Sequence, residues 1–244
     1  MFWRKFKLDW SYAVGELLIV IIGVLIALSI DQWNDDRLER AEEVDAVARI
    51  LTDIRTDLQD FDFRLKAVGA KEESLLRVKI NLAGGALNDP AAFLRDIIGG
   101  ADFGWNQGLA RRSTYDNLLE SGKLGIIADS SIRAQISDYY RYYQDSHNRI
   151  DERETHYPAL SYQLVPRSIS TTQNQGVEWE LEVESNLSDS QLNELVELVQ
   201  KSTIRDHVIA ELNLARFIRG IELNLQGRAE SLTSLLQEYQ TSIQ

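Results

Sequence analysis

Side chains that usually carry chemistry are scarce in this sequence. Its 244 residues include three histidines and no cysteine, which excludes disulfides, thiolate metal sites and cysteine catalysis. Glu152 and His156 are four residues apart, so on a helix they would share one face and could supply half of a metal site. No second pair of this kind accompanies them, and an ion pair on a helix surface is the simpler interpretation. We therefore expect no bound metal.

The sequence motifs of common enzyme classes are also missing. There is no Walker loop, no nucleophile elbow and no dinucleotide fingerprint. The glycine pairs at 84–85 and 99–100 lie where helices are expected to end. The acidic run at 151–154 is typical of a solvated helix face. These patterns predict a protein that is not an enzyme and binds no cofactor.

The charge is strongly acidic and unevenly distributed. The formal net charge is −12, and residues 1–30 carry three cations against two carboxylates, or +1, which leaves −13 for the remainder. An acidic portion of this size repels nucleic acid and anionic lipid, so we expect no nucleic-acid partner.

An apolar run near the N-terminus is long enough to cross a bilayer. Residues 13–30 are almost entirely apolar, and no charged residue occurs from Leu17 to Ile30. Trp10 and Tyr12 precede the run and Trp33 follows it. On a helix Tyr12 and Trp33 would lie about 32 Å apart, which is close to the thickness of a hydrocarbon core. The pattern predicts a transmembrane helix over 12–33 with these three aromatic residues as anchors at the membrane interfaces.

One face of this helix has the residues that allow helices to pack in a membrane. Gly23 and Ala27 form a small-xxx-small pair, and Glu16 falls near the same face. One interpretation is that this face packs against a second copy or another membrane protein. The alternative is that the small residues have no partner and that Glu16 reaches toward the headgroups.

The charges that flank the apolar run predict its orientation. Three cations precede it and three carboxylates follow it, namely Arg4, Lys5, Lys7, Asp31, Asp35 and Asp36. The positive-inside rule places residues 1–11 in the cytoplasm and residues 34–244 outside. A signal peptide cleaved near Ala27-Leu28-Ser29 is the alternative.

The segment VGELLIVIIGVLIALSIDQWN, residues 14–34, resembles the N-terminal signature of a family of uncharacterised bacterial single-span membrane proteins. The matching residues are Gly15, Glu16, Ile22, Gly23, Leu25, Ile26, Ala27, Leu28, Trp33 and Asn34. Family members often have amides before the Trp, where this chain has Asp31 and Gln32. A weaker likeness covers Thr114 to Tyr140. The resemblance implies a single-span topology and no activity. Together with the orientation that the flanking charges predict, it leads us to expect a protein of the bacterial inner membrane with a periplasmic domain.

Residues 34–244, which follow the predicted span, are predicted to form long helices. Apolar residues follow a 3-4-3-4 spacing from Val44 to Val68, which predicts a helix over 34–82 with a narrow seam that continues the span as one rod. A second seam runs from Leu225 to Ile243. Shorter helices are expected at 90–98, at 113–121, from 130 through Tyr157, and at 189–201. The predicted fold is all-α, an antiparallel bundle built on these long helices.

Three details of this bundle are less regular. Residues 165–187 are predicted to be irregular or extended, because VEWELEVE alternates apolar and acidic residues. This strand-like stretch is expected to lie on the bundle as an extended loop or to offer an edge to another chain, and a small hairpin with 159–166 is the less favoured alternative. The loop that carries Phe103 and Trp105 is expected to cover the bundle end, and the alternative is that its aromatic residues bind a partner. In the DYYRYYQ segment, Tyr139 and Tyr143 are expected on the core face of the helix. Tyr140 and Tyr142 point away from that face, toward a neighbouring helix or a binding surface, and a place in the core is favoured for them too.

These observations favour a membrane-anchored helical bundle that acts as a non-enzymatic scaffold or interaction module. Its expected partners are the lipid bilayer and a second copy or a membrane protein. The alternative is a sensory or ligand-binding periplasmic bundle that signals through a membrane partner.

Overall fold

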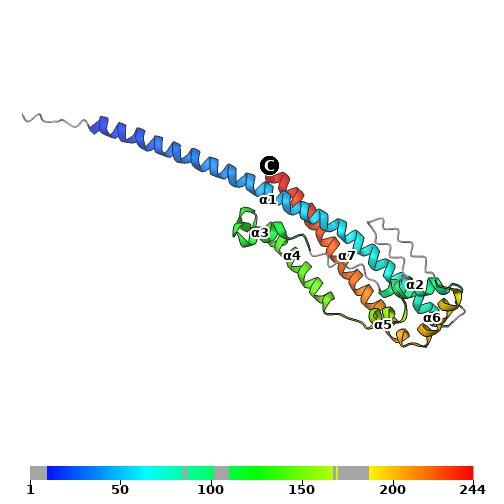
Figure 1. The fold of residues 1–244 in the computed structure, drawn as a ribbon. Helices are drawn as coiled ribbons and strands as arrows, with labels where there is room; N and C mark the ends of the chain where they lie inside the picture. The colour runs from blue at the N-terminus through cyan, green and yellow to red at the C-terminus, as the bar shows by residue number, and fades with distance from the viewer. Residues whose placement is uncertain (1–9, 85–86, 102–109, 167–168, 170–186, 244) are drawn as a thin grey trace, which may run out of the picture.

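The computed structural model describes residues 10–84, 87–101, 110–166, 169 and 187–243, and it describes side chains from residue 15 onward. Within these ranges the chain is helical and contains no strand, so the all-α fold class is confirmed. Figure 1 shows the elements: α1 (Trp10–Leu82), α2 (Pro90–Ala101), α3 (Ser113–Glu120), the 3-10 helix η1 (Lys123–Ile126), α4 (Ser130–Asp151), α5 (Tyr157–Leu164), α6 (Asp189–Lys201) and α7 (Ile204–Ile243). The alternating segment 177–184 and the loop with Phe103 and Trp105 lie outside the described residues.

Two long helices, α1 and α7, lie side by side in opposite directions and form the axis of the bundle (Figure 1). Arg216 Nε lies 2.8 Å from Glu72 Oε1, whereas Gln226 Nε2, further along α7, lies 2.8 Å from Asp62 Oδ1, nearer the start of α1. The predicted seam of α7 is buried from Leu225 to Leu236. The same spacing continues back to Ile204, so almost the whole length of α7 packs on the bundle.

The core face of α1 differs in part from the predicted seam. One predicted line, the six apolar residues spaced by seven from Val47 to Leu82, is fully buried. On the other line Leu51 is buried, but Val44, Leu58 and Leu65 are only half-buried. A different heptad line takes its place in the core: Glu43, Ile50, Asp57, Arg64, Lys71 and Val78. Four of these six residues are charged, so a search for apolar residues alone could not select this line.

At the bundle end away from the apolar part of α1, the helices α2, α5 and α6 pack around α1 and α7. We expected Gly99-Gly100 to stop α2, but the helix continues through both to Ala101. A Cβ on Gly100 would lie 2.7 Å from Leu75 Cδ2 and 3.0 Å from the Tyr157 hydroxyl. The glycines therefore allow α2 to approach α1 and α5 closely, and they do not end the helix.

The tyrosines of α4 fill the space between α4 and α1. Tyr139 and Tyr143 are buried, as predicted. Tyr140 points away from the face with Tyr139 and Tyr143 and is buried against a neighbouring helix, where its ring stacks on Tyr115 of α3 with the ring centroids 4.6 Å apart. Tyr142 is half-buried under the guanidinium of Arg228. The neighbouring helices α3 and α7 thus cover the tyrosines of α4 that do not lie on its core face.

The helix α4 is shorter than predicted. It was expected to run through Tyr157, but it ends at Asp151, and a separate helix α5 begins at Tyr157. Pro158 lies in the first turn of α5, where a proline lacks no helical hydrogen bond. The turn between α4 and α5, residues 152–156, faces α7 and becomes part of the site described below.

Candidate functional site

The N-terminal part of α1 is apolar and projects away from the bundle (Figure 1). Its large apolar side chains between Leu17 and Ile30 are 44–73% exposed, which makes a far larger apolar surface than soluble monomers show. Among the described residues this is the one helix long and apolar enough to cross a membrane. None of its apolar window is buried, unlike the core helix of a soluble protein. A membrane span and an N-terminal signal sequence both meet this criterion.

The predicted anchors and packing residues lie along this projecting segment. Trp33 is 65% exposed, and the guanidinium carbon of Arg37 lies 5.8 Å from its ring centroid. The side chains of Trp10 and Tyr12 are outside the described part of the chain, although both residues belong to α1. No side chain lies within 4 Å of a Cβ built on Gly23, and Ala27 is exposed, so the predicted packing face is open. Its contact with another helix stays a prediction.

Inside the bundle, the charged residues of α1 form a line of buried polar contacts. Glu43, Asp57, Arg64 and Lys71 are each at most 4% exposed. Each makes contacts with residues far away in the sequence, on α4, α7 or the connections around them. Burying a charge without a partner is very unfavourable, so these partners determine how the helices fit together.

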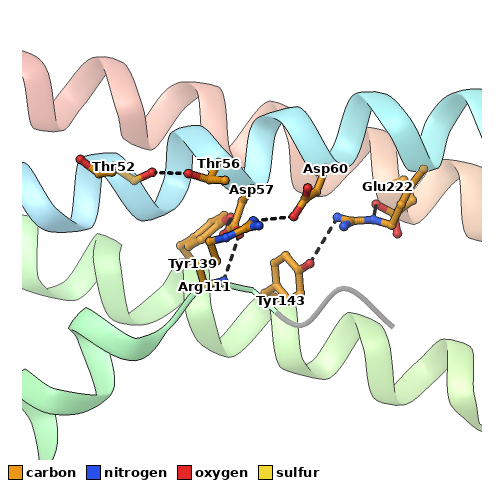
Figure 2. Close-up of polar contacts among 9 residues, drawn as sticks. Thr52, Thr56, Asp57, Asp60, Arg111, Tyr139, Tyr143 and Glu222 are labelled. Carbon is orange, nitrogen blue, oxygen red and sulfur yellow. Dashed lines mark hydrogen bonds and ion pairs between the residues drawn. The ribbon is translucent and has the colours of Figure 1, made fainter. Parts of the chain in front are cut away.

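Arg64 lies at the centre of this line, between α7 and α4. Its Nε donates to Glu222 Oε2 at 2.9 Å, and its Nη2 donates to the Tyr143 hydroxyl at 3.2 Å (Figure 2). The guanidinium also lies over the ring of Phe61, 4.6 Å from the centroid. Burial raises the pKa of Glu222, and the charge of Arg64 opposes that effect. One cation thus connects three helices in a site closed by aromatic rings.

Asp57 is two helical turns nearer the apolar part of α1 and binds the segment before α3. It accepts the Arg111 backbone N–H at 3.0 Å and the Tyr139 hydroxyl at 3.1 Å. Arg111 also forms an ion pair with Asp60 at 2.5 Å, as Figure 2 shows. Burial raises the pKa of Asp57, while the hydrogen bonds from Arg111 and Tyr139 lower it. These contacts attach α4 and the chain before α3 to α1.

Glu43 makes the corresponding contacts where the bundle begins. Its Oε1 accepts the Ala128 backbone N–H at 2.7 Å and the hydroxyl of Tyr239, close to the end of α7. Its Oε2 pairs with Arg40 at 3.2 Å. The carboxylate therefore joins the start of the packed part of α1 to the η1–α4 connection and to α7.

Lys71 pairs with Glu211 of α7, and this pair differs from the others because it lines a hollow. Lys71 Nζ lies 2.5 Å from Glu211 Oε1, and the two side chains are 4% and 2% exposed. The hydroxyl of Thr155 donates to Glu211 Oε2. The hollow beside the pair is open to solvent, has a volume of about 610 Å³ and is lined by residues of α1, α2, α4, α5 and α7 and of the α4–α5 turn. This volume is within the usual range for small-molecule sites.

The three histidines are not brought together as a metal site. Glu152 and His156 do not share a helix face, because α4 ends before Glu152 and His156 caps α5. His156 instead meets the ring of His207 edge to face, with the centroids 5.7 Å apart. His147 is buried and stacks on Tyr143. Within the described ranges no group of three or more potential ligands could hold a metal ion.

Sequence reasoning missed the buried charges, although signals for some of them were present. Glu211 and Glu222 fall on the seam of α7 when its spacing is continued toward Ile204. On α1, charged residues at 57, 64 and 71 recur at the heptad spacing beside an apolar line that recurs in the same way. A charged residue at a repeated core position is a signal for a buried pair.

Comparison with known proteins places the chain in a family. Residues 16–155 match the model of a family of unknown function, DUF6090. The matched region includes most of α1 and the helices α2 to α4, with Asp57, Arg64 and Lys71, whereas Glu211 and Glu222 lie beyond it. No curated protein and no solved structure matches the chain. Because the match covers more than half of the chain, this protein belongs to the DUF6090 family of unknown function.

Proposed function

We propose that this protein is a single-pass protein of a bacterial inner membrane that holds a helical bundle in the periplasm as a non-enzymatic scaffold or interaction module. The observation that carries the proposal is the continuity of α1. One helix of 73 residues begins as an exposed apolar segment and ends as the central helix of the bundle core. The anchor and the bundle are therefore joined without a flexible linker.

A charged stalk separates the two parts of α1. Residues 31–42 are helical and almost entirely exposed, and they contain five carboxylates and two arginines. Twelve helical residues span about 18 Å, so the bundle begins at roughly that distance from the end of the apolar segment. The cations before the span and the carboxylates after it support a cytoplasmic N-terminus and a periplasmic bundle.

The internal contacts support a structural role for the buried charges. Glu43, Asp57 and Arg64 bind partners on other elements of the same chain, and those partners hold α4 and α7 on α1. Such an arrangement suits a bundle that must keep one shape while it presents its surface to another protein.

The topology is tested with two fusions at the C-terminus, one to alkaline phosphatase and one to green fluorescent protein. The proposal expects an active phosphatase and a dark fluorescent protein, because phosphatase folds in the periplasm. A variant with Arg4, Lys5 and Lys7 changed to glutamate is the control, and it should lose part of this preference. A bright fluorescent fusion with inactive phosphatase would reverse the orientation.

The interaction role is tested with a photo-crosslinking amino acid placed on the bundle in living cells. Leu119, Leu198 and Leu223 are large apolar residues that are about half exposed, so they are the first positions to label. A scaffold should give an adduct of one reproducible mass from at least one position. Glu230, exposed on α7, serves as a control that should give none. Smears or no adduct from all three positions would contradict the interaction role.

A second candidate function is a ligand-binding bundle that signals through a membrane partner. The hollow beside Lys71 and Glu211 favours it, because a buried ion pair that lines a space of about 610 Å³ can contact a small molecule.

A further inference from the structure

We infer that the hollow beside Lys71 and Glu211 binds a small zwitterion of the amino-acid type, with an ammonium group, a carboxylate and an apolar side chain. The inference rests on the ligand-binding candidate above. It does not depend on the membrane topology or on the scaffold role.

The contrast between two buried ion pairs points to this hollow. Phe61 and Tyr143 contact the guanidinium of Arg64, and neither Arg64 nor Glu222 lines the hollow beside Lys71. Lys71 and Glu211 are buried to the same degree, yet both line a space large enough for a small molecule. A structural pair needs no such space beside it.

The lining of the hollow includes both signs of charge, and the two charged groups are in contact. Lys71 Nζ and Glu211 Oε1 are 2.5 Å apart, and Thr155 adds a hydroxyl on the second oxygen of Glu211. In an amino acid the ammonium and the carboxylate are held on one carbon, so they too are adjacent. Such a head group can place its carboxylate toward Lys71 and its ammonium toward Glu211. A ligand with a single charge would satisfy one member of the pair and compete with the other.

The walls and the rim agree with this class of ligand. Ala101, Ile150 and Ile218 are buried apolar residues that line the hollow and can hold an apolar side chain. The rim again has both signs, with Arg153 beside Asp151 and Glu154. A rim of mixed charge does not favour a simple anion or a simple cation, whereas a zwitterion interacts with both signs.

The test uses the full-length protein purified in detergent, with binding measured by isothermal titration calorimetry and thermal unfolding followed by circular dichroism. The probes are L-leucine and L-phenylalanine, compared with 3-methylbutylamine and 4-methylpentanoate, which each keep only one of the charged groups of leucine. At least one amino acid should bind and raise Tm. The two single-charge analogues should bind at least tenfold more weakly than leucine or not at all.

Two pairs of variants locate the site. Ala159→Trp places a large ring at the exposed edge of the hollow and should abolish binding, whereas Gln163→Trp on the same helix, outside the hollow, should not. Lys71→Met/Glu211→Met should also abolish binding, and the matched Arg64→Met/Glu222→Met should retain it. The tryptophan pair decides the matter if a methionine variant fails to fold.

The outcomes separate the ligand class from the ligand-binding function. If leucine and one single-charge analogue bind equally well, and both lose binding in Ala159→Trp, the zwitterion specificity is refuted. The hollow would then be a site for ligands that carry the single charge of that analogue. Amino-acid binding that Ala159→Trp does not change would overturn the location. No binding of any of the four probes would overturn the inference and remove the support for the ligand-binding candidate.

Discussion

The ion pair between Arg64 and Glu222 allows a quantitative test of the buried line. Glu222 is fully buried, and Arg64 is about 5% exposed at its side chain. Changing Arg64 to Met removes the cation but leaves the carboxylate in a site where water cannot reach it. Breaking a buried pair in this way costs about 3–5 kcal/mol of folding free energy. We expect that loss for Arg64→Met and a similar loss for Glu222→Met.

The double variant should behave differently from either single one. With both residues changed to Met, no charge is left uncompensated, and replacing a whole buried pair by apolar residues of similar volume is often neutral. We expect the double variant to lie within about 1 kcal/mol of the wild type, apart from the hydrogen bond lost by Tyr143, which is worth about 0.5–1.5 kcal/mol. The cycle should therefore show strong coupling between the two residues.

The measurement is urea unfolding of the full-length protein in mild detergent, followed by circular dichroism at the helical minimum. With an m-value of about 2–3 kcal/mol/M, a loss of 3–5 kcal/mol lowers the midpoint by roughly 1–2.5 M. Arg49→Met is the matched control, because Arg49 pairs with Asp45 on the exposed face of α1, where a pair contributes at most about 1 kcal/mol. If the stability losses of Arg64→Met and Glu222→Met simply add in the double variant, the two side chains do not form the buried, mutually dependent ion pair that the geometry describes.

Three further predictions concern other parts of the bundle. Burial lowers the pKa of His147, so as the pH falls through about 6.5 the unfolded chain takes up a proton before the folded chain does. The free energy of unfolding should therefore decrease below that pH, by up to about 1.4 kcal/mol per pH unit. In thermal unfolding measured between pH 5 and 8, His147→Gln should remove this component. Gly100→Ala should lower stability in urea by about 1–2 kcal/mol, since its Cβ would meet Leu75, whereas Gly220→Ala on the open face of α7 should leave stability unchanged or raise it by up to about 1 kcal/mol. Spin labels on either side of the stalk should give a narrow distance distribution in electron paramagnetic resonance, and a broad one would contradict a continuous α1.

The sequence is sufficient to predict those parts of the fold that depend on a few neighbouring residues. Asp129 caps α4 by accepting the backbone N–H groups of Ser131 and Ile132, and Ser188 forms a capping box with Gln191 at the start of α6. Both follow from side chains that compete for the free N–H groups of a first turn, which depends on a few neighbouring residues. The seam of α7 was equally accessible, because its apolar spacing is long and regular.

The line of buried charged residues on α1 could not be predicted in the same way, because its burial depends on residues far away in the sequence. Whether Arg64 faces water or the core depends on Glu222, which is 158 residues away in the sequence. A charged residue on a long helix is usually exposed, so a search for apolar residues moved the seam by one position and placed Leu58 and Leu65 where Asp57 and Arg64 lie. Gly100 shows the same limit, since only the positions of Leu75 and Tyr157 reveal why it must be a glycine.

The unbroken α1 also couples the length of the stalk to the direction in which the bundle faces. Each residue added to an α-helix advances it by about 1.5 Å and turns it by about 100°. One residue inserted in the stalk, residues 31–42, would therefore swing the bundle through more than a quarter of a turn about the helix axis. Seven residues would move it outward by about 10 Å and return it to nearly the same heading. The number of residues in the stalk therefore sets the direction in which the bundle faces relative to Gly23 and Ala27, and the height of the bundle changes without its direction only when the insertion is close to a whole number of turns.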